Sequence, residues 1–305
     1  MEILQSTITN MVNNILTTSR TSCPICGGLH IRKNGKTPGK RQRYYCISCG
    51  KTFSQFTATP LHYSKKPIEN WILYMINLGN SLTLKTAGKI CNVSLTTSFY
   101  WRHKLLNSLT IQQSQELFTD ILHINEVNIP ISNKGNHKDK SKSWRRGSWT
   151  CGNIFTPFVK IFSFADNNDL RNILPMDNVT MVSSYHIKTY IMPKISKNTT
   201  VTARKHKAYL PFAKEKNLKI EEFDVLNKTY KNNKAALNQV LTFKEFLGSR
   251  GGVSTKYLTS YARWFTWLFL KPKENILELV HRIFLNPKAI RIYEIPKLNL
   301  RGELG

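Results

Sequence analysis

Four cysteines have the types and spacing that point most directly to chemistry. Cys23 and Cys26 form one C-x-x-C pair, and Cys46 and Cys49 form a second. Each pair makes a tight knuckle with two thiolates, and two knuckles joined by a hairpin complete a tetrahedral sulfur site for Zn²⁺. Two unrelated redox pairs would share this motif. The glycine that follows each pair and the basic hairpin between them favour a zinc ribbon instead.

The zinc ion is expected to be structural. A module this small has too little apolar core to fold alone, and Zn²⁺ binding supplies about 10–16 kcal/mol in comparable peptides. The remaining cysteines, Cys91 and Cys151, stand alone in apolar segments, so we expect buried thiols rather than nucleophiles.

A second candidate site lies in the segment TDILHINEVNI, residues 119–129, which has the pattern of a buried strand. Asn125 and Glu126 interrupt it with adjacent polar side chains. A polar residue in such a strand must be hydrogen-bonded or take part in chemistry. Because a strand alternates its faces, Asn125 and Glu126 are predicted to point to opposite sides of a sheet.

The charge of the chain indicates a polyanionic partner. Its 305 residues include 45 Lys and Arg against 18 Asp and Glu, a net charge of +27, and 41% hydrophobic residues indicate a folded protein. Between Glu2 and Glu116 the only acidic residue is Glu69. A long, folded and almost purely cationic region favours nucleic acid as the partner over a merely solvated surface.

The elements that must position these residues fall into five segments. We expect an N-terminal helix at 1–20, a zinc ribbon at 21–56, a helical module at 64–110, a mixed α/β domain at 117–272 and a C-terminal helix and tail at 273–305. The fold class is therefore multidomain α+β. Residues 131–147 are predicted to form an exposed loop.

The chain is not expected to associate with a membrane. The most apolar run, residues 261–270, is too short to span a bilayer and contains Arg263, so it is predicted to be a core helix. No secretory signal is visible at the start. We expect a cytoplasmic, nucleoid-associated protein from a prokaryotic source.

The helical module has the pattern of a helix-turn-helix. Ile68, Trp71, Ile72 and Met75 share one face of a first helix. Cys91, Asn92 and Val93 are predicted to turn the chain between the next two helices, and Ser94 to cap a recognition helix from Leu95 to Leu106. An ordinary helical hairpin would show a similar pattern. The residues expected to face DNA are Ser94, Thr96, Thr97, Tyr100, Arg102 and Lys104, with Arg41 and Arg43 from the ribbon.

Several blocks in order resemble a known family, the insertion-sequence transposases with a zinc ribbon, a helix-turn-helix and a DDE catalytic domain. The blocks are CPICGG…IRKNGK…RQRYYCISCGKTFS, VSLTTSFYWRHKLL, ISNKGN, ARKHKAYLPFAKEKNLK and RGGVSTKYLTSYARWF. The resemblance implies an RNase H-like domain that cuts and joins double-stranded DNA in transposition, a form of DNA recombination. It also implies self-association into homo-oligomers, and no small-molecule substrate.

The family's chemistry needs carboxylates that hold two divalent ions, and this chain departs from that pattern. The family positions fall on Asn125, Arg204 and Asn238. An Asn offers one neutral oxygen, and Mg²⁺ prefers charged oxygen ligands. A guanidinium about 4 Å from a divalent ion is repelled by roughly 8 kcal/mol at an effective dielectric of about 20. No catalytic residue is therefore intact, although Glu126 and Glu245 are possible substitutes.

Three functions follow from these residues. The preferred one is a transposase-like protein of a mobile element that binds DNA sequence-specifically and has an inactive catalytic centre. The second is an active transposase, dependent on Mg²⁺, with a rearranged set such as Glu126, Asp166 and Glu245. The third is a zinc-dependent transcriptional regulator. Asp166 lies in FADNNDL, which reads better as a turn than as a metal site.

Overall fold

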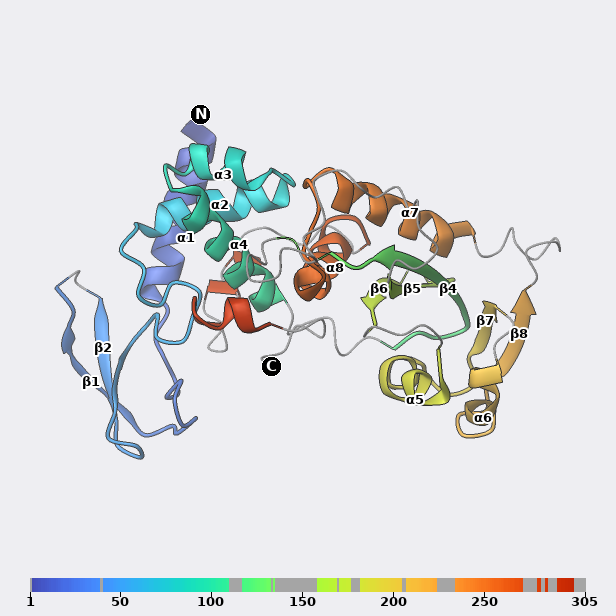
Figure 1. The fold of residues 1–305 in the computed structure, drawn as a ribbon. Coiled ribbons are helices and arrows are strands. Elements are labelled where there is room, and N and C mark those ends of the chain that lie inside the picture. The colour runs from blue at the N-terminus through green and yellow to red at the C-terminus, as the bar shows by residue number, and fades with distance from the viewer. Residues whose placement is uncertain are drawn as a thin grey trace. The chain divides into compact units, whose positions relative to one another are not determined.

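The chain divides into two compact units (Figure 1). One contains Met1–Leu109 and Lys273–Pro296, and the other contains Thr110–Pro272 and Lys297–Gly305. Among the described residues, no helix is both long and apolar enough to span a bilayer. The computed structural model describes residues 2–38, 41–109, 117–132, 134, 158–168, 170–176, 182–204, 207–223, 234–270, 279–280, 283–284 and 290–298.

The helices of the first unit begin with α1 (Glu2–Thr17), where the N-terminal helix was predicted. They continue with α2 (Ile68–Gly79), α3 (Leu84–Ile90) and α4 (Leu95–Ser108). The predicted apolar face of α2 is confirmed, because all four of its residues are buried. Trp71 of this face stacks on Trp101 of α4, with ring centroids 4.0 Å apart.

Two side-chain caps set the start of α3 and α4. The Thr83 hydroxyl accepts a hydrogen bond from the Thr86 amide at 3.2 Å, and the Ser94 hydroxyl accepts one from the Thr97 amide at 3.1 Å. The cap predicted at Ser94 is therefore confirmed. Gly88 makes the close approach between the helices, because a Cβ there would lie 3.1 Å from the Val93 carbonyl oxygen.

The first unit also contains a three-stranded antiparallel sheet in the order β1-β2-β3. Its strands are β1 (Ile31–Lys36), β2 (Gln42–Cys46) and β3 (Thr52–Ser54). Tyr44, Cys46 and Phe53 pack with Cys23 into a small core on one side of the sheet. The hairpin predicted between the cysteine pairs is therefore present.

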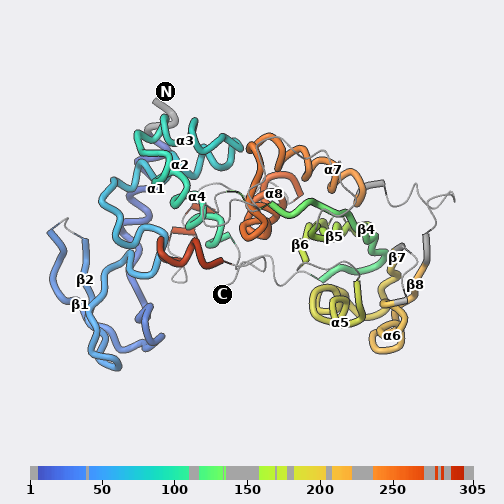
Figure 2. Tube along the Cα trace, viewed as in Figure 1, coloured from blue at the N-terminus to red at the C-terminus, as the bar shows by residue number. Residues whose placement is uncertain are grey.

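The second unit is built on a five-stranded mixed sheet in the order β6-β5-β4-β7-β8. The first strand in sequence is central, as the trace in Figure 2 shows, and it pairs antiparallel with β5 and parallel with β7. β6 is antiparallel to β5, and β8 is parallel to β7. The strands are β4 (Ile121–Pro130), β5 (Phe158–Asp166), β6 (Arg171–Pro175), β7 (Thr200–Arg204) and β8 (Lys219–Phe223).

Helices lie on both faces of this sheet (Figure 1). One face carries Leu122, Ile124 and Phe164, which pack with residues from the π-helical turn Ile187–Ile191 and from α6 (Leu210–Ala213). The short helix α5 (Ser184–His186) precedes this turn. The other face is covered by α7 (Lys234–Gly248), which contacts β4, β5 and β6. Asn125 belongs to this second face, because residues alternate sides along β4.

The helix predicted at 261–270 is present and its first part is buried, but Phe269 near its end is 52% exposed. It forms α8 (Leu258–Phe265) and a π-helical turn, Thr266–Leu270, and Trp264 and Phe265 are fully buried. Residues 135–147 of the predicted exposed loop, Cys151 and most of the C-terminal segment 273–305 lie outside the described residues.

Candidate metal centre and nucleic-acid interface

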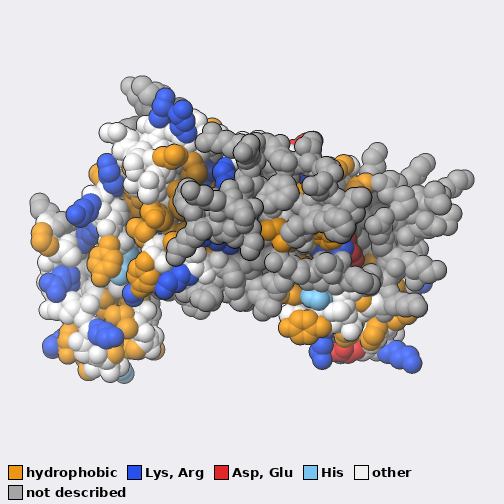
Figure 3. Space-filling view, in the orientation of Figure 1, with side chains coloured by type: hydrophobic (Ala, Val, Ile, Leu, Met, Phe, Trp, Pro, Cys, Tyr) orange, Lys and Arg blue, Asp and Glu red, His pale blue; other side chains and the backbone are white. Residues whose placement is uncertain are grey.

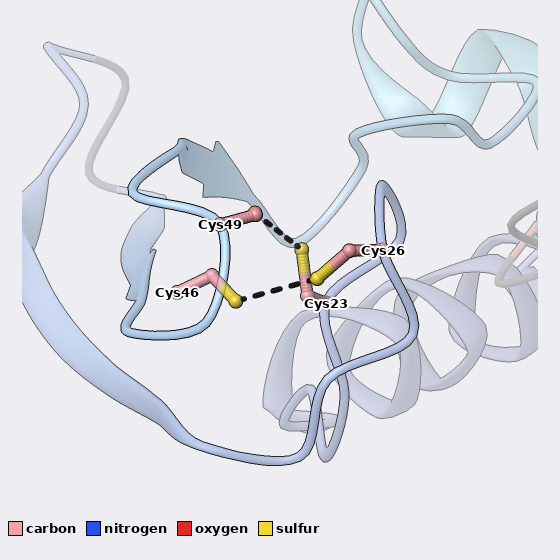
Figure 4. A group of neighbouring side chains, drawn as sticks. All are labelled: Cys23, Cys26, Cys46 and Cys49. Atoms are coloured by element: carbon pink, nitrogen blue, oxygen red, sulfur yellow. Dashed lines mark hydrogen bonds between the residues drawn. The ribbon is translucent and has the colours of Figure 1, made fainter.

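The four predicted zinc ligands converge on one point, with their sulfur atoms directed toward one another (Figure 4). The Cys23 and Cys49 sulfurs lie 3.8 Å apart, the Cys26 and Cys46 sulfurs lie 3.6 Å apart, and all four lie within 4.8 Å of one another. A tetrahedral site with Zn–S bonds of about 2.3 Å requires sulfur–sulfur distances of about 3.8 Å. The four thiols therefore fit a Zn²⁺ ion closely.

The backbone of the first knuckle is arranged to serve sulfur ligands. The amides of Ile25 and Gly28 donate to the sulfurs of Cys23 and Cys26, each at 3.4 Å. Gly27 and Gly50, one after each knuckle, have φ values of 77° and 69° and donate their amides to the carbonyls of Cys23 and Cys46. These left-handed positions explain why glycine follows each cysteine pair.

The pKa values of Cys46 and Cys49 are shifted in opposite directions by their surroundings. Burial opposes ionisation of Cys46, but hydrogen bonds from the Cys49 backbone and the neighbouring thiols lower its pKa to about 7. At Cys49 a backbone hydrogen bond from Lys51 favours the thiolate, but burial and the other thiols outweigh it and raise the pKa to about 12. A divalent cation removes this conflict, because it stabilises all four thiolates together.

Arg41 and Arg43 of the ribbon differ in their surroundings. The Arg41 guanidinium lies 5.0 Å from the centroid of the Phe56 ring, and its residue is half-buried. Arg43, in β2, is exposed. Lys and Arg side chains are spread over the visible face of this unit (Figure 3).

The first turn of α4 is the part of this helix that reaches solvent. Ser94, Leu95 and Thr96 are exposed, while Thr97 and Tyr100 are half-buried. Leu95, at the first position of the helix, is 60% exposed. The predicted DNA-facing residues at the start of α4 are thus accessible.

Arg102 and Lys104 require a correction, because both are buried inside the first unit. A nitrogen of the Arg102 guanidinium donates to the Leu82 carbonyl at 2.7 Å, and the Lys104 ammonium donates to the Pro60 carbonyl at 3.1 Å. Burial lowers the pKa of Lys104 to about 8. Both side chains lie on the buried side of α4, where they bond to backbone carbonyls of neighbouring segments. Neither cation is therefore available to DNA.

Two cations that sequence reasoning missed lie beside the exposed end of α4. Lys85 and Lys89 of α3 are exposed and line a hollow of about 370 Å³ with Asn92 and Leu95. Their spacing of one helical turn is a signal that could have identified them, because it places both side chains on one face of α3.

Asn125 and Arg204, the first two positions taken from the family resemblance, lie on neighbouring strands of the second unit. β4 and β7 pair in parallel from Ile121 and Thr200 to His123 and Thr202. Asn125 and Arg204 each follow two residues after the last of these pairs. His123, on the same face as Asn125, lies 2.6 Å from the Thr202 hydroxyl through its Nδ1 atom, and burial lowers its pKa.

The cross-strand neighbour of Asn125 on β5 is neutral. Asn125 is 9% exposed and pairs with Ser163 of β5, which is fully buried. The Ser163 hydroxyl donates to the side-chain oxygen of Gln239 at 3.3 Å, and the Gln239 amide donates to the Phe164 carbonyl at 3.2 Å. This part of the sheet face is thus lined by amide and hydroxyl groups.

The positions proposed on α7 do not face this site. Asn238 and Glu245 are both exposed, two helical turns apart on the solvent side of α7. Gln239, which sequence reasoning passed over, is 4% exposed and points to Ser163. Adjacent residues of a helix point in different directions, so these two sequence neighbours differ in burial.

Glu126 and Asp166 have other partners. Glu126 is on the opposite face of β4 from Asn125, as the strand alternation predicted, and its carboxylate lies 3.7 Å from the Lys160 ammonium. One oxygen of Asp166 accepts hydrogen bonds from the amides of Asn168 and Leu170, at 2.9 and 2.8 Å. The turn role expected for Asp166 is therefore confirmed.

Comparison with known proteins gives only distant likenesses. No protein-family profile and no curated protein sequence matches the chain. A chain in the simian T-cell lymphotropic virus intasome complex with the PP2A regulatory subunit B56 gamma has a TM-score of 0.34 and 9% identity, covering 66% of this chain and 70% of that chain. The Mos1 strand transfer complex has a TM-score of 0.31 and 10% identity, covering 73% and 77%.

A Mos1 transposase paired-end complex with the left transposon end has a TM-score of 0.27 and 12% identity, covering 68% of this chain and 78% of that chain. Likeness at these TM-scores is too slight to establish a common fold or function.

Proposed function

We propose that this protein is a transposase-like DNA-binding protein whose nuclease centre has lost its metal ligands. The proposal combines the family resemblance of the sequence blocks with the charge of the chain and the geometry of the two units. In it, the first unit carries a zinc ribbon and a helix-turn-helix, and the second is an RNase H-like domain. Homo-oligomerisation and a nucleoid location are further predictions of the same resemblance.

The observation that carries the proposal is that Asn125 and Arg204 lie on adjacent parallel strands, each two residues past the paired His123 and Thr202. The two residues were assigned to metal positions from sequence blocks about eighty residues apart, with no use of strand pairing. The family's two-metal chemistry takes carboxylates from different strands, and these two positions fall on neighbouring strands of the sheet. One of the two is neutral and the other is cationic.

The neutral surroundings support loss of catalysis. Ser163 and Gln239 beside Asn125 offer hydroxyl and amide groups, and Mg²⁺ sites in nucleic-acid enzymes depend on carboxylates. An active centre rebuilt from Glu126, Asp166 and Glu245 has no support here. Glu126 is on the opposite face near Lys160, Asp166 is bonded within a turn, and Glu245 is on the solvent side of α7.

The proposed DNA contact is the exposed start of α4 together with α3. In helix-turn-helix proteins the N-terminal residues of the second helix meet base edges in the major groove, and the first helix crosses the backbone. Thr96 and Leu95 offer a hydroxyl and an apolar contact suited to a thymine methyl group. Lys85 and Lys89 lie beside them and would meet phosphates.

Zinc supports this interface indirectly. Cys23, Cys26, Cys46 and Cys49 would hold Zn²⁺, which supplies the free energy that the small ribbon core lacks. The β1–β3 sheet then holds its exposed cations in fixed positions.

Electrophoretic mobility shifts with duplex DNA across a series of salt concentrations test DNA binding. The proposal predicts a steep fall in affinity with salt, because Lys and Arg release counterions from phosphates. A preference for one duplex sequence that persists as salt rises would support the major-groove contact. Affinity independent of salt, or no shift at low salt, would overturn the DNA-binding part of the proposal.

A further inference from the structure

The three-stranded sheet of the ribbon has one face that its core does not use. Register fixes this face, because cross-strand partners lie on the same side of a sheet. Arg32 pairs with Tyr45, Tyr45 pairs with Thr52, and Arg43 pairs with Ser54. These five residues therefore share the side opposite to Tyr44, Cys46 and Phe53, which form the core around the cysteines.

A cation–π pair of Arg32 and Tyr45 lies on this open face. The Arg32 guanidinium is 4.9 Å from the centroid of the Tyr45 ring, a cation–π arrangement. Arg32 and Arg43 are exposed, Tyr45 is half-buried, and the exposed Lys51 follows the second knuckle close by. A Cβ built on Gly50 would lie 3.8 Å from the Tyr45 hydroxyl, so the knuckle flanks that end of the ring.

The chemistry of this face suits bases and phosphates together. Arg32 of β1 and Arg43 of β2 share this face with the Tyr45 ring, and the chain carries no acidic residue between Glu2 and Glu69. Proteins that bind single strands combine cationic grooves with aromatic side chains on which unpaired bases stack. In a duplex the faces of the bases are already stacked on one another, so a ring and guanidinium can stack only on an unpaired base.

We propose that the open face formed by Arg32, Arg43 and Tyr45 binds a single-stranded polynucleotide. An unpaired base stacks on the Arg32–Tyr45 pair, and the adjoining phosphates pair with Arg43 and Lys51. This inference deepens the proposed DNA binding and rests on it for the class of ligand. It adds a surface that is separate from the start of α4 and has a different preference for strand state.

Fluorescence anisotropy of the zinc-loaded full chain with short labelled oligonucleotides tests the inference. The probes are a mixed-pyrimidine single strand as DNA, the same sequence as RNA, and the DNA annealed to its complement. Arg32→Ala and Tyr45→Leu are expected to weaken single-strand binding by about 5- to 100-fold, the range measured for lost base stacking. Their effect on duplex binding is expected to be at most a few-fold.

Lys33→Ala is the matched control. Lys33 follows Arg32 on β1, is also exposed, and points to the opposite side because it pairs with Tyr44. The Lys33→Ala substitution removes the same charge as Arg32→Ala, so it is expected to weaken binding to the single-stranded and duplex probes slightly and equally. Zinc content measured on each variant shows whether the ribbon is intact, and a variant that lacks zinc is left out of the comparison. The milder Tyr45→Phe keeps the aromatic ring and is expected to retain single-strand binding.

Two results would overturn the inference. One is an equal loss for Arg32→Ala and Lys33→Ala, which means that charge alone acts. The other is unchanged single-strand binding in zinc-loaded Tyr45→Leu. Failure of the proposed function would differ, because the wild-type protein would then bind neither the duplex nor either single strand. The DNA and RNA arms show which polynucleotide the face prefers, and either one supports the inference.

Discussion

His123 of β4 pairs with Thr202 of the neighbouring parallel strand β7, and Asn125 and Arg204 each follow two residues later along these strands. A neutral amide and a cationic residue thus lie beyond the same end of the β4–β7 pairing. Gln239 and Ser163 complete a neutral hydrogen-bonded neighbourhood on the other side of Asn125. The proposed loss of the metal site therefore involves a group of residues that share one region of the sheet.

Returning carboxylates to this region is expected to create divalent-ion binding. Asn125→Asp combined with Arg204→Asp removes the repulsive cation and supplies two charged ligands on adjacent strands. Calorimetric titration of the zinc-loaded protein with Mn²⁺ is expected to show a binding isotherm that the wild-type protein lacks. No heat of binding in the folded double variant would contradict the alignment of β4 and β7 with the family.

A third carboxylate distinguishes the two candidate positions on α7. Gln239→Glu, added to the double variant, is expected to tighten Mn²⁺ binding by about tenfold or more, because this side chain reaches Ser163. Asn238→Glu is the matched control, since it adds the same charge on the exposed side of the helix. A larger gain from Asn238→Glu would favour Asn238 as the third position.

Removal of a zinc ligand is expected to unfold the ribbon. Cys46→Ser replaces a fully buried ligand, and the protein should lose its Zn²⁺, measured by metal analysis, together with the ribbon's resistance to protease. Cys91→Ser is the control, because Cys91 is buried near Asn77 of α2 and away from the knuckles. Zinc retained by Cys46→Ser at the wild-type level would contradict the four-cysteine site.

Substitutions on α3 and α4 should separate DNA contact from folding. Lys85→Gln and Lys89→Gln are each expected to weaken duplex binding and to lower the salt slope by about one unit, without changing thermal stability. Arg102→Gln is expected to lower the melting temperature, because the buried guanidinium bonds to the Leu82 carbonyl. Reduced salt slope in a stably folded Arg102→Gln would restore Arg102 as a DNA contact.

Lys104 predicts how stability depends on pH. Its pKa is about 8 in the folded chain against 10.5 for a free lysine, so the unfolded chain binds more protons between these values. The free energy of unfolding should therefore rise with pH over this window. The cost of burying the charged Lys104 ammonium, on the order of 3 kcal/mol, is fully present below the window. Urea unfolding across the window should show a smaller rise in Lys104→Met than in wild type.

The exposed Lys85→Met serves as the control for this measurement, because its ammonium is solvated in both states. It is expected to keep the wild-type rise. The same rise in Lys104→Met as in Lys85→Met would show that burial of Lys104 does not set the pH dependence.

Features with local causes could be predicted from the sequence. The spacing of the cysteines predicted the four-cysteine cluster, and Ser94 predicted the start of α4. The helical spacing of apolar residues in α2 predicted which face of that helix is buried. Alternation along β4 correctly separated Asn125 from Glu126. Each of these depends on geometry within a few residues, which the order of residue types determines.

Features that depend on packing between distant segments were missed. In the sequence, Arg102 and Lys104 were expected to face DNA, yet their side chains donate hydrogen bonds to the carbonyls of Leu82 and Pro60. Gln239 and Asn238 are adjacent polar residues of α7, but only Gln239 is directed toward Ser163 of β5. No local pattern encodes these contacts, because the partner segments come together only in the folded unit.

Loss of the nuclease centre is tested most directly by a cleavage assay on DNA that flanks the gene, where the ends of the proposed mobile element would lie. The wild-type chain, loaded with zinc, is incubated with supercoiled and linear DNA in Mg²⁺ and in Mn²⁺, and nicking and strand transfer are measured. The account predicts binding of the DNA without cleavage or strand transfer with either ion. Metal-dependent cleavage that disappears in Asn125→Ala would contradict the proposed loss of the nuclease centre.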